Sequence, residues 1–264
     1  EVEDTVATPF MGLNLGSTKV RQDWRGTIQP LVFESPLVRL MKDHGYRDAY
    51  GDGRALTDVP GKRIPARSVI IHRYYDRASK ELGEGQIPSI PEAAAELEAL
   101  ILKVRERVCG EDSVAQHAFK VYLVAHSMGG IVVRCFLQNP KIGAPETKQL
   151  VDKVFTYATP HNGIEMLGVN VPAWMKAMDM SNFNRSRLAS FFGLPEDSQD
   201  VRSLNGTFDP NRFFCLIGTI AGDYHVAGDL SRRLVGSLSD GLVRIDNAYV
   251  ARAPRAFVHR SHSG

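Results

Sequence analysis

The chain has 264 residues, of which 43% are hydrophobic and 23% charged, and this is long enough for one large domain with a substantial core. Its 32 basic and 30 acidic residues leave a net charge of +2, which argues against a nucleic acid or an anionic membrane as partner. No apolar run reaches the length of a stable membrane span and no linker divides the sequence, so we expect a single domain over residues 1–264.

The first part of the chain alternates short apolar strands with helices. In chain order we expect a strand at 4–11, a glycine-rich loop at 12–17, a helix at 35–45, a strand at 68–74 and a helix at 91–108. The last helix has the clearest pattern, because Ala94, Leu97, Ile101 and Val104 recur on one face and Gly110 follows as a stop signal.

The second part continues in the same rhythm. We expect a strand at 121–124, a turn at 125–129, a helix at 130–138, a strand at 154–158, an insertion at 163–211, a strand at 213–218 and a short strand near 256. This order implies right-handed crossovers and a mainly parallel central sheet flanked by helices. The fold class is therefore α/β.

A serine lies at the sharpest turn of this pattern. Ala125-His126-Ser127-Met128-Gly129 has the form small-x-Ser-x-Gly between a strand and a helix. Such a turn holds its serine in strained backbone geometry, so its flanking residues must be small, and Ala125 replaces the usual first glycine of a nucleophile elbow. The serine hydroxyl then projects at the helix N-terminus, where backbone N–H groups can face developing negative charge.

A serine nucleophile needs a histidine base and an acid that orients it. His161 directly follows a strand, which indicates a structural role in the pocket wall, and His225 is too close to Asp223 for an obvious triad. His259 and His262 both lie in the last segment, where the base is expected.

For the acid, Asp240 is favoured because it precedes Gly241 in a tight loop, which lets the carboxylate point back into the site. Asp246 and Asp223 are the alternatives.

Three motifs carry a resemblance to a known family: AHSMGG at 125–130, ATPHNG at 158–163 and SDGLV at 239–243, the last followed by a late histidine. With them the chain resembles the lipase and esterase branch of the α/β-hydrolase superfamily, including the bacterial triacylglycerol lipases. The resemblance implies an α/β-hydrolase fold with Ser127 as nucleophile, Asp240 as acid and His262 as base, since the spacing of the last two is similar to that of bacterial lipases.

Two departures from the family accompany this resemblance. Ala125 replaces the first elbow glycine, as in some bacterial lipases. The sequence ends at Gly264 where the family has a closing helix, so whether the natural chain continues stays open.

The oxyanion hole needs two N–H donors. One is expected from the backbone of Met128, and the other from Phe10 or Met11 in the loop after the first strand.

The insertion at 163–211 is rich in methionine and aromatic residues. It predicts either a lid over an apolar pocket or an ordinary pair of helices packed on the core. We expect His126, Trp174 and Met178 to contact substrate.

These features predict a serine hydrolase that cleaves carboxylic esters, of lipid-like or other acyl substrates, through an acyl-enzyme. Acyl transfer to an alcohol, hydrolysis of an amide or polyester, and a non-catalytic binding module are the alternatives. The expected partner is a small-molecule or lipid ester, which is compatible with transient contact with a lipid interface.

No metal or organic cofactor is required by this chemistry, although a calcium site near Asp223 and Asp229 is an alternative. Cys109, Cys135 and Cys215 do not form a disulfide framework, which favours a reducing compartment such as the cytoplasm. A secreted location stays open because the sequence starts at Glu1 and not at methionine.

Overall fold

The computed structural model describes residues 20–22, 28–30, 40–51, 54–72, 74, 88–166, 169–170, 180–220 and 238–262. The chain divides into two compact units, one formed by Glu1–Ser89 and Ala99–Phe119, the other by Ile90–Glu98 and Lys120–Gly264. No helix in the described ranges is long and apolar enough to cross a membrane.

The first unit contains short strand pairs and short helical segments. Its elements are β1 (Val20–Gln22) antiparallel to β2 (Ile28–Pro30), β3 (Arg47–Asp48) parallel to β6 (Ser68–Val69), β4 (Tyr50–Gly51) antiparallel to β5 (Arg54–Ala55), η2 (Leu56–Asp58) and α4 (Ser113–Ala118). Residues 40–44 are helical, as predicted for 35–45. The predicted strand at 4–11 and loop at 12–17 lie outside the described residues.

The predicted strand at 68–74 is shorter in the structure. Only Ser68–Val69 forms β6, because its partner β3 ends where the chain turns at Ala49 into the β4–β5 hairpin. A strand ends where its neighbour no longer offers backbone groups.

The predicted helix at 91–108 is confirmed as α3 (Ile90–Cys109). Its expected apolar face is buried, including Ala94, Leu97 and Ile101. Gly110 follows with a φ of 55°, a left-handed conformation that glycine adopts without a steric cost and that ends the helix.

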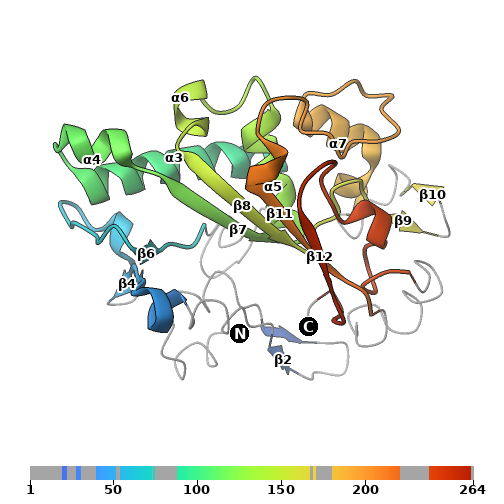
Figure 1. Cartoon of the computed structure of the whole chain (residues 1–264), viewed down its shortest axis with the longest axis horizontal. Helices are drawn as coiled ribbons and strands as arrows, with labels where there is room; N and C mark the ends of the chain where they lie inside the picture. The colour runs from blue at the N-terminus through green and yellow to red at the C-terminus, as the bar shows by residue number, and fades with distance from the viewer. Residues whose placement is uncertain are drawn as a thin grey trace. The chain divides into compact units, whose positions relative to one another are not determined.

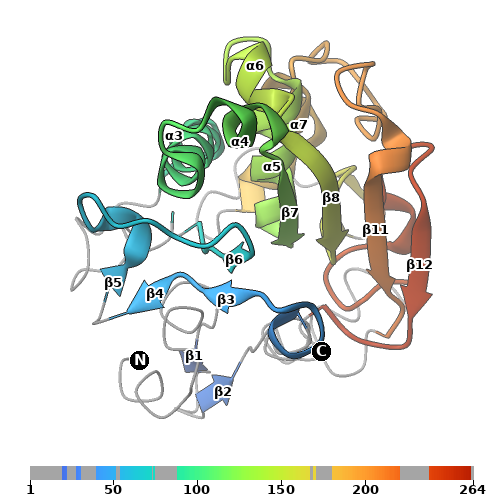
Figure 2. The same ribbon diagram turned by 60° about the vertical axis from the view of Figure 1, so that its left-hand side comes forward.

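The second unit is built on a parallel sheet of four strands in the order β12-β11-β8-β7. Its strands are β7 (Val121–His126), β8 (Val151–Tyr157), β11 (Phe213–Gly218) and β12 (Arg255–Val258), which confirms the four strands predicted from 121 onward. All neighbouring pairs are parallel, and Figure 2 shows the four arrows running in the same direction. Their carboxyl ends therefore meet at one edge of the sheet, where loops can gather functional side chains.

The interpretation of 121–124 as a buried strand needs correction. Tyr122 and Val124 are 57% and 59% exposed, whereas Val121 and Leu123 are half-buried and Ala125 is buried. This alternation is the pattern of a strand with one covered face.

The central helix of this unit is α5 (Met128–Gln138), which begins directly after the turn that follows β7. Every residue from Gly130 to Gln138 is buried, as expected for a helix that is apolar almost all round. The helix ends at Asn139, whose extended conformation suits a residue before Pro140. It packs against β7 and against α7 (Arg185–Phe192), and Figure 1 shows it beside the sheet.

The predicted insertion at 163–211 is described in part. It contains the hairpin of β9 (Glu165–Met166) and β10 (Val169–Asn170), then η5 (Met180–Phe183), α7 and η6 (Pro210–Arg212). Leu188, Ala189 and Phe192 of α7 are buried, which agrees with the packed-helix alternative. The lid stays a prediction, since residues 167–168 and 171–179 lie outside the described part. The remaining described elements of the unit are α6 (Pro145–Lys148) and η7 (Ile245–Asn247).

Candidate active site

Ser127 occupies the turn between β7 and α5 in a strained backbone conformation. Its φ of 49° and ψ of −122° lie in a region that L-residues other than glycine rarely enter. The turn is held from both sides, because the Ser127 N–H donates to Tyr157 O at the end of β8 and Gly130 N–H donates to Ser127 O. Strain of this kind persists only where the surrounding structure over-determines it.

The second glycine after the serine is required by close packing. A Cβ atom on Gly130 would lie 2.3 Å from Thr159 Oγ1 and 2.5 Å from its Cγ2, which is far inside contact distance. Thr159 belongs to the ATPHNG motif that follows β8. The small residues of the elbow therefore serve two needs, the tight turn itself and the approach of the next loop.

Asp240 lies in a compact loop that follows β11 in the chain and is closed by a bridge between Ser239 and Arg244. Its Oδ1 accepts the N–H groups of Leu242 (3.0 Å) and Val243 (2.7 Å), so one carboxylate oxygen is occupied by the loop itself. Gly241 has a φ of 100°, a conformation that favours glycine and turns the backbone away from the carboxylate. The other oxygen, Oδ2, is thereby directed out of the loop.

His262 connects Asp240 to Ser127. Its Nδ1 is 2.9 Å from Asp240 Oδ2, and its Nε2 is 2.9 Å from Ser127 Oγ. Because a carboxylate oxygen only accepts, Nδ1 carries the proton and Nε2 faces the serine hydroxyl as an acceptor. Asp240 is 1% and His262 5% exposed, so the contact between them is shielded from water, whereas Ser127 is half-buried.

The alternative acid and base have different surroundings. His259 and Asp246 are both exposed, and no contact brings either of them to Ser127 within the described residues. Asp223, the other alternative for the acid, lies outside those residues, and so do His225, Phe10, Met11, Trp174 and Met178. Met128 is the first residue of α5, which places its backbone N–H at the helix N-terminus.

His126, expected from the sequence to contact substrate, lies against Tyr157 and His262. Its ring is 4.9 Å from the Tyr157 ring and 5.2 Å from the His262 ring, measured between centroids. Its Nε2 is 2.9 Å from the backbone oxygen of His262.

His161, by contrast, is a core residue with no exposed surface. Its Nε2 is 3.0 Å from Thr156 Oγ1, while Nδ1 has no hydrogen-bond partner among the described atoms. Burial and, second, the nearby Arg134 cation hold the pKa of His161 well below 6.5, so its imidazole is neutral at pH 7.

A buried arginine that the sequence analysis missed links α5 to two distant segments. Arg134 has no exposed surface, and its guanidinium donates to the backbone oxygens of His161, Val201 and Ser203 and to the side chain of Gln138. It also lies 3.8 Å from the ring centroid of Phe192. Burial lowers the pKa of Arg134 to about 9, so the side chain remains charged at neutral pH. One signal was available, since Arg134 interrupts the apolar sequence IVVRCFL.

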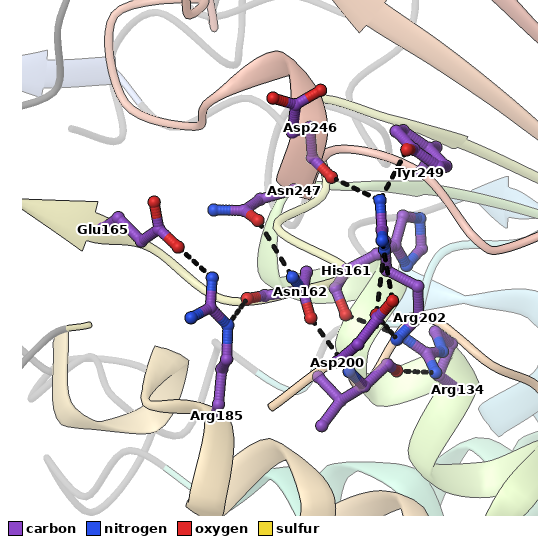
Figure 3. A network of polar contacts seen from close by, with 11 residues as sticks. Arg134, His161, Asn162, Glu165, Arg185, Asp200, Arg202, Asp246, Asn247 and Tyr249 are labelled. Carbon is purple, nitrogen blue, oxygen red and sulfur yellow. Dashed lines mark hydrogen bonds and ion pairs between the residues drawn. The ribbon is translucent and has the colours of Figure 1, made fainter. Parts of the chain in front are cut away.

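Asn162 of the ATPHNG motif joins the same region to the segment that follows Asp240. Its side chain donates to Asn247 Oδ1 (3.0 Å) and accepts the Val201 N–H (2.9 Å), while its backbone N–H donates to Asn247 O (2.9 Å). Arg185 of α7 donates to its backbone oxygen. Figure 3 shows Asn162 at the centre of these contacts.

An ion-pair chain runs beside these hydrogen bonds. Glu165 pairs with Arg185 and, at 3.6 Å, with Arg244 at the end of the Asp240 loop. Side chains from the ATPHNG motif and from β9 thus reach the segment that carries Asp240.

No group of three or more histidine, cysteine, aspartate or glutamate side chains suited to a metal ion occurs in the described ranges. Asp223 and Asp229, the alternative calcium ligands, lie outside those ranges.

Comparison with known proteins adds to this geometry. The family model of the PGAP1-like alpha/beta domain matches residues 93–172, which include the elbow, α5, β8 and the ATPHNG motif. A strained serine between a parallel strand and a buried helix, at the carboxyl edge of a parallel sheet, is the arrangement of the nucleophile elbow. This is an α/β-hydrolase fold.

Solved structures of similar shape include two forms of the Bacillus licheniformis lipase BlEst2. The mature form is 18% identical with a TM-score of 0.46, and the match covers 66% of this chain and 68% of that one. The propeptide form is 19% identical with a TM-score of 0.44, and the match covers 66% of this chain and 37% of that one. Comparison with curated protein sequences gave no match.

Within the α/β-hydrolase fold, the carboxyl ends of the strands and the loops that follow them carry the reactive groups. Ser127 follows β7 and the ATPHNG motif follows β8. Asp240 lies in the segment after β11, and His262 lies after β12. The chain order Ser, Asp, His is also that of this fold.

Proposed function

We propose that the chain is a serine hydrolase that cleaves carboxylic esters through an acyl-enzyme, with Ser127 as nucleophile, His262 as base and Asp240 as the acid that orients it. The observation that carries the proposal is the unbroken path from Ser127 Oγ through the His262 ring to Asp240 Oδ2, with both links at 2.9 Å. Contacts of this length are within the range required for proton transfer.

In the acylation step, His262 Nε2 removes the hydroxyl proton as Ser127 Oγ forms a bond to the ester carbonyl carbon. The imidazolium that results is stabilised by Asp240, whose burial with His262 strengthens their electrostatic attraction. When the tetrahedral intermediate collapses, the ester C–O bond breaks and His262 returns its proton to the leaving alcohol.

The oxyanion of the tetrahedral intermediate requires donors that are already in place. We assign one to the backbone N–H of Met128, which follows the nucleophile and begins α5. A helix N-terminus carries a partial positive charge that favours an anion there. The second donor is proposed at Phe10 or Met11.

In the deacylation step, water replaces the alcohol. His262 takes a proton from a water molecule as the water oxygen forms a bond to the acyl carbon. The bond between the acyl carbon and Ser127 Oγ then breaks, His262 gives the proton to Oγ, and the acid departs. The net reaction is hydrolysis of an ester to an acid and an alcohol, with no change in oxidation state.

The substrate class proposed is an ester with an apolar acyl chain. The support is compositional, since the insertion that contains Trp174 and Met178 is rich in methionine and aromatic residues. These two side chains and His126 are proposed to contact the acyl group.

The test is hydrolysis of p-nitrophenyl esters of increasing acyl length by the wild type and by Ser127→Ala. Loss of a triad nucleophile typically lowers kcat by about 10⁶-fold, so the variant should fall close to background. A wild type that hydrolyses none of the esters, or a Ser127→Ala variant as active as the wild type, would overturn the proposal.

The chain offers matched controls for the other two roles. Asp240→Asn and His262→Ala should each lower kcat by about 10⁴-fold or more. Asp246→Asn and His259→Ala change the same residue types nearby in sequence, at exposed positions, and should retain the wild-type rate. If Asp246→Asn lowered kcat as much as Asp240→Asn, the assignment of the acid would be contradicted. If His259→Ala lowered kcat as much as His262→Ala, the assignment of the base would be contradicted.

A further inference from the structure

His262 lies outside any regular element, because β12 ends at Val258. Besides the contact of its Nε2 with Ser127, it makes hydrogen bonds to Asp240 and His126. Its backbone N–H donates to Asp240 O (2.8 Å) and its ring Nδ1 donates to Asp240 Oδ2. Its backbone oxygen accepts a hydrogen bond from His126 Nε2 (2.9 Å). The first two contacts position His262 relative to the acid, and the third positions it relative to β7, the strand that leads into Ser127.

The His126 ring is itself constrained. His126 is the last residue of β7 and lies opposite Tyr157 of β8 in the parallel register. Its ring is tilted by 34° to the Tyr157 ring and by 50° to the His262 ring. Because a carbonyl oxygen only accepts, Nε2 must carry a proton, which defines the tautomer in which this contact exists.

We infer that His126 is a positioning residue for the catalytic base. Its Nε2–H ties the backbone of His262 to the end of β7, and the next residue of that strand carries the nucleophile. The separation of His262 Nε2 and Ser127 Oγ is then set by one short, rigid segment. This inference rests on the function proposed above and gives His126 a role different from the acyl contact proposed there, and the kinetics of its variants distinguish the two roles.

The two roles of His126 predict different kinetics. Loss of a substrate contact raises KM and varies with the length of the acyl chain. Loss of a constraint on the base lowers kcat for every ester, because displacement by about 1 Å costs on the order of 10²-fold in rate.

The experiment compares His126→Leu, which removes the donor, with His126→Gln, whose side-chain amide offers an N–H close to the position of Nε2. Both are assayed on a short-chain and a long-chain p-nitrophenyl ester under conditions where acylation limits the rate. We expect His126→Leu to lower kcat by about 10- to 100-fold with KM nearly unchanged on both esters. His126→Gln should recover most of the loss.

Two further measurements separate positioning from damage to the fold. Thermal unfolding of both variants should lie close to that of the wild type, and His259→Leu, an exposed histidine of the same segment as His262, should retain full activity. Labelling of Ser127 by a small fluorophosphonate reports the serine and its base without any acyl pocket, and its rate should fall in His126→Leu and recover in His126→Gln.

The positioning role of His126 is refuted, and the proposed function is not, if the wild type is active and His126→Leu is equally active. The positioning role also fails if Gln is as slow as Leu in a folded protein, or if the loss appears in KM and depends on acyl length. The proposed function fails instead if wild type and Ser127→Ala behave alike.

Discussion

Gly218, the last residue of β11, lies against Asp240 so closely that it leaves no room for a side chain. A Cβ atom at position 218 would be 2.9 Å from Asp240 Cβ and 2.6 Å from the backbone oxygen of Arg260. The Asp240 loop and the segment that leads to His262 therefore converge over the end of one strand. They approach this closely only because that strand ends in glycine.

This contact predicts the effect of adding one methyl group. Gly218→Ala should displace both the Asp240 loop and the Arg260 backbone and lower kcat/KM by on the order of 10²-fold. Both neighbours would have to move, because the obstructing atoms include a backbone oxygen. Steady-state kinetics on the preferred ester would measure the effect.

Gly206→Ala is the matched control for this change. Gly206 has a φ of 74°, and no described atom lies within 4 Å of the Cβ that alanine would add, so alanine there costs backbone strain alone. It should lower the free energy of unfolding by about 1 kcal/mol and leave kcat unchanged. A Gly218→Ala variant with wild-type kcat would show that the two loops tolerate the displacement.

The buried arginine predicts a large loss of stability on substitution. Arg134→Met removes the donors for the backbone oxygens of His161, Val201 and Ser203. Each buried group left unpaired costs about 1–3 kcal/mol, partly offset by removal of a buried charge, so we expect a net loss of about 3 kcal/mol or more. Urea unfolding followed by circular dichroism would measure it.

Arg212→Met tests whether burial is the cause. Arg212 also donates to two backbone oxygens, those of Val151 and Asp152, but its side chain is 38% exposed and water can replace it. Its loss should cost about 1 kcal/mol or less. Comparable losses in the free energy of unfolding for the two variants would show that burial is not the cause of the Arg134 effect.

The buried, neutral His161 predicts a dependence of stability on pH. Its pKa in the folded chain is well below the 6.5 of an exposed histidine, so between these values the unfolded chain binds a proton that the folded chain does not. Above pH 6.5, His161 does not lower the free energy of unfolding. As the pH drops below 6.5, it lowers this free energy by up to about 1.4 kcal/mol per pH unit.

His161→Gln should reduce this dependence on pH. The free energy of unfolding, measured between pH 7 and pH 5, should fall less steeply in the variant than in the wild type. His259→Gln, at an exposed position, should leave the slope unchanged. Parallel curves for His161→Gln and the wild type would place the acid sensitivity elsewhere.

Asn162 is predicted to couple the ATPHNG motif to the acid-bearing segment. Asn162→Ala leaves the Val201 N–H and Asn247 Oδ1 without their partner, both in buried residues, and should cost about 2–4 kcal/mol. Asn211→Ala removes an amide that contacts Asp209 at the surface and should change stability by less than about 0.5 kcal/mol.

A double-mutant cycle with Asn247→Ala would separate the pair from the rest of the network. Residues in direct contact show coupling energies of about 0.5–3 kcal/mol, so the double variant should be less damaged than the sum of the single ones. Additive losses would mean that the two amides act independently.

Local patterns allowed much of this molecule to be predicted from its sequence. The strand, turn and helix around Ser127 could be recognised because each depends on a pattern of neighbouring residues. For β11, the predicted bounds are those of the structure. The aspartate-glycine pair at Asp240 was informative for the same reason, since the positive φ of Gly241 is a local requirement.

What could not be predicted depends on residues far apart in the chain. Nothing in the sequence near Arg134 reveals the backbone oxygens of Val201 and Ser203 that surround it. Residue patterns alone also left His259 and His262 open, because both lie in the last segment and the contact of His262 with Ser127 depends on the tertiary fold. The exposure of Val124 depends on what packs on each face of the sheet, which a short apolar run does not encode.

The positive φ of Ser127 places two requirements in conflict at one position, the stability of the folded state and the presence of the hydroxyl group. A non-glycine residue held there raises the energy of the folded state by about 1–3 kcal/mol, a sizeable share of the stability of an ordinary domain. Glycine would relieve that strain and remove the hydroxyl at the same time. A screen for heat-resistant descendants of this chain would therefore be expected to enrich Ser127→Gly unless activity is selected as well.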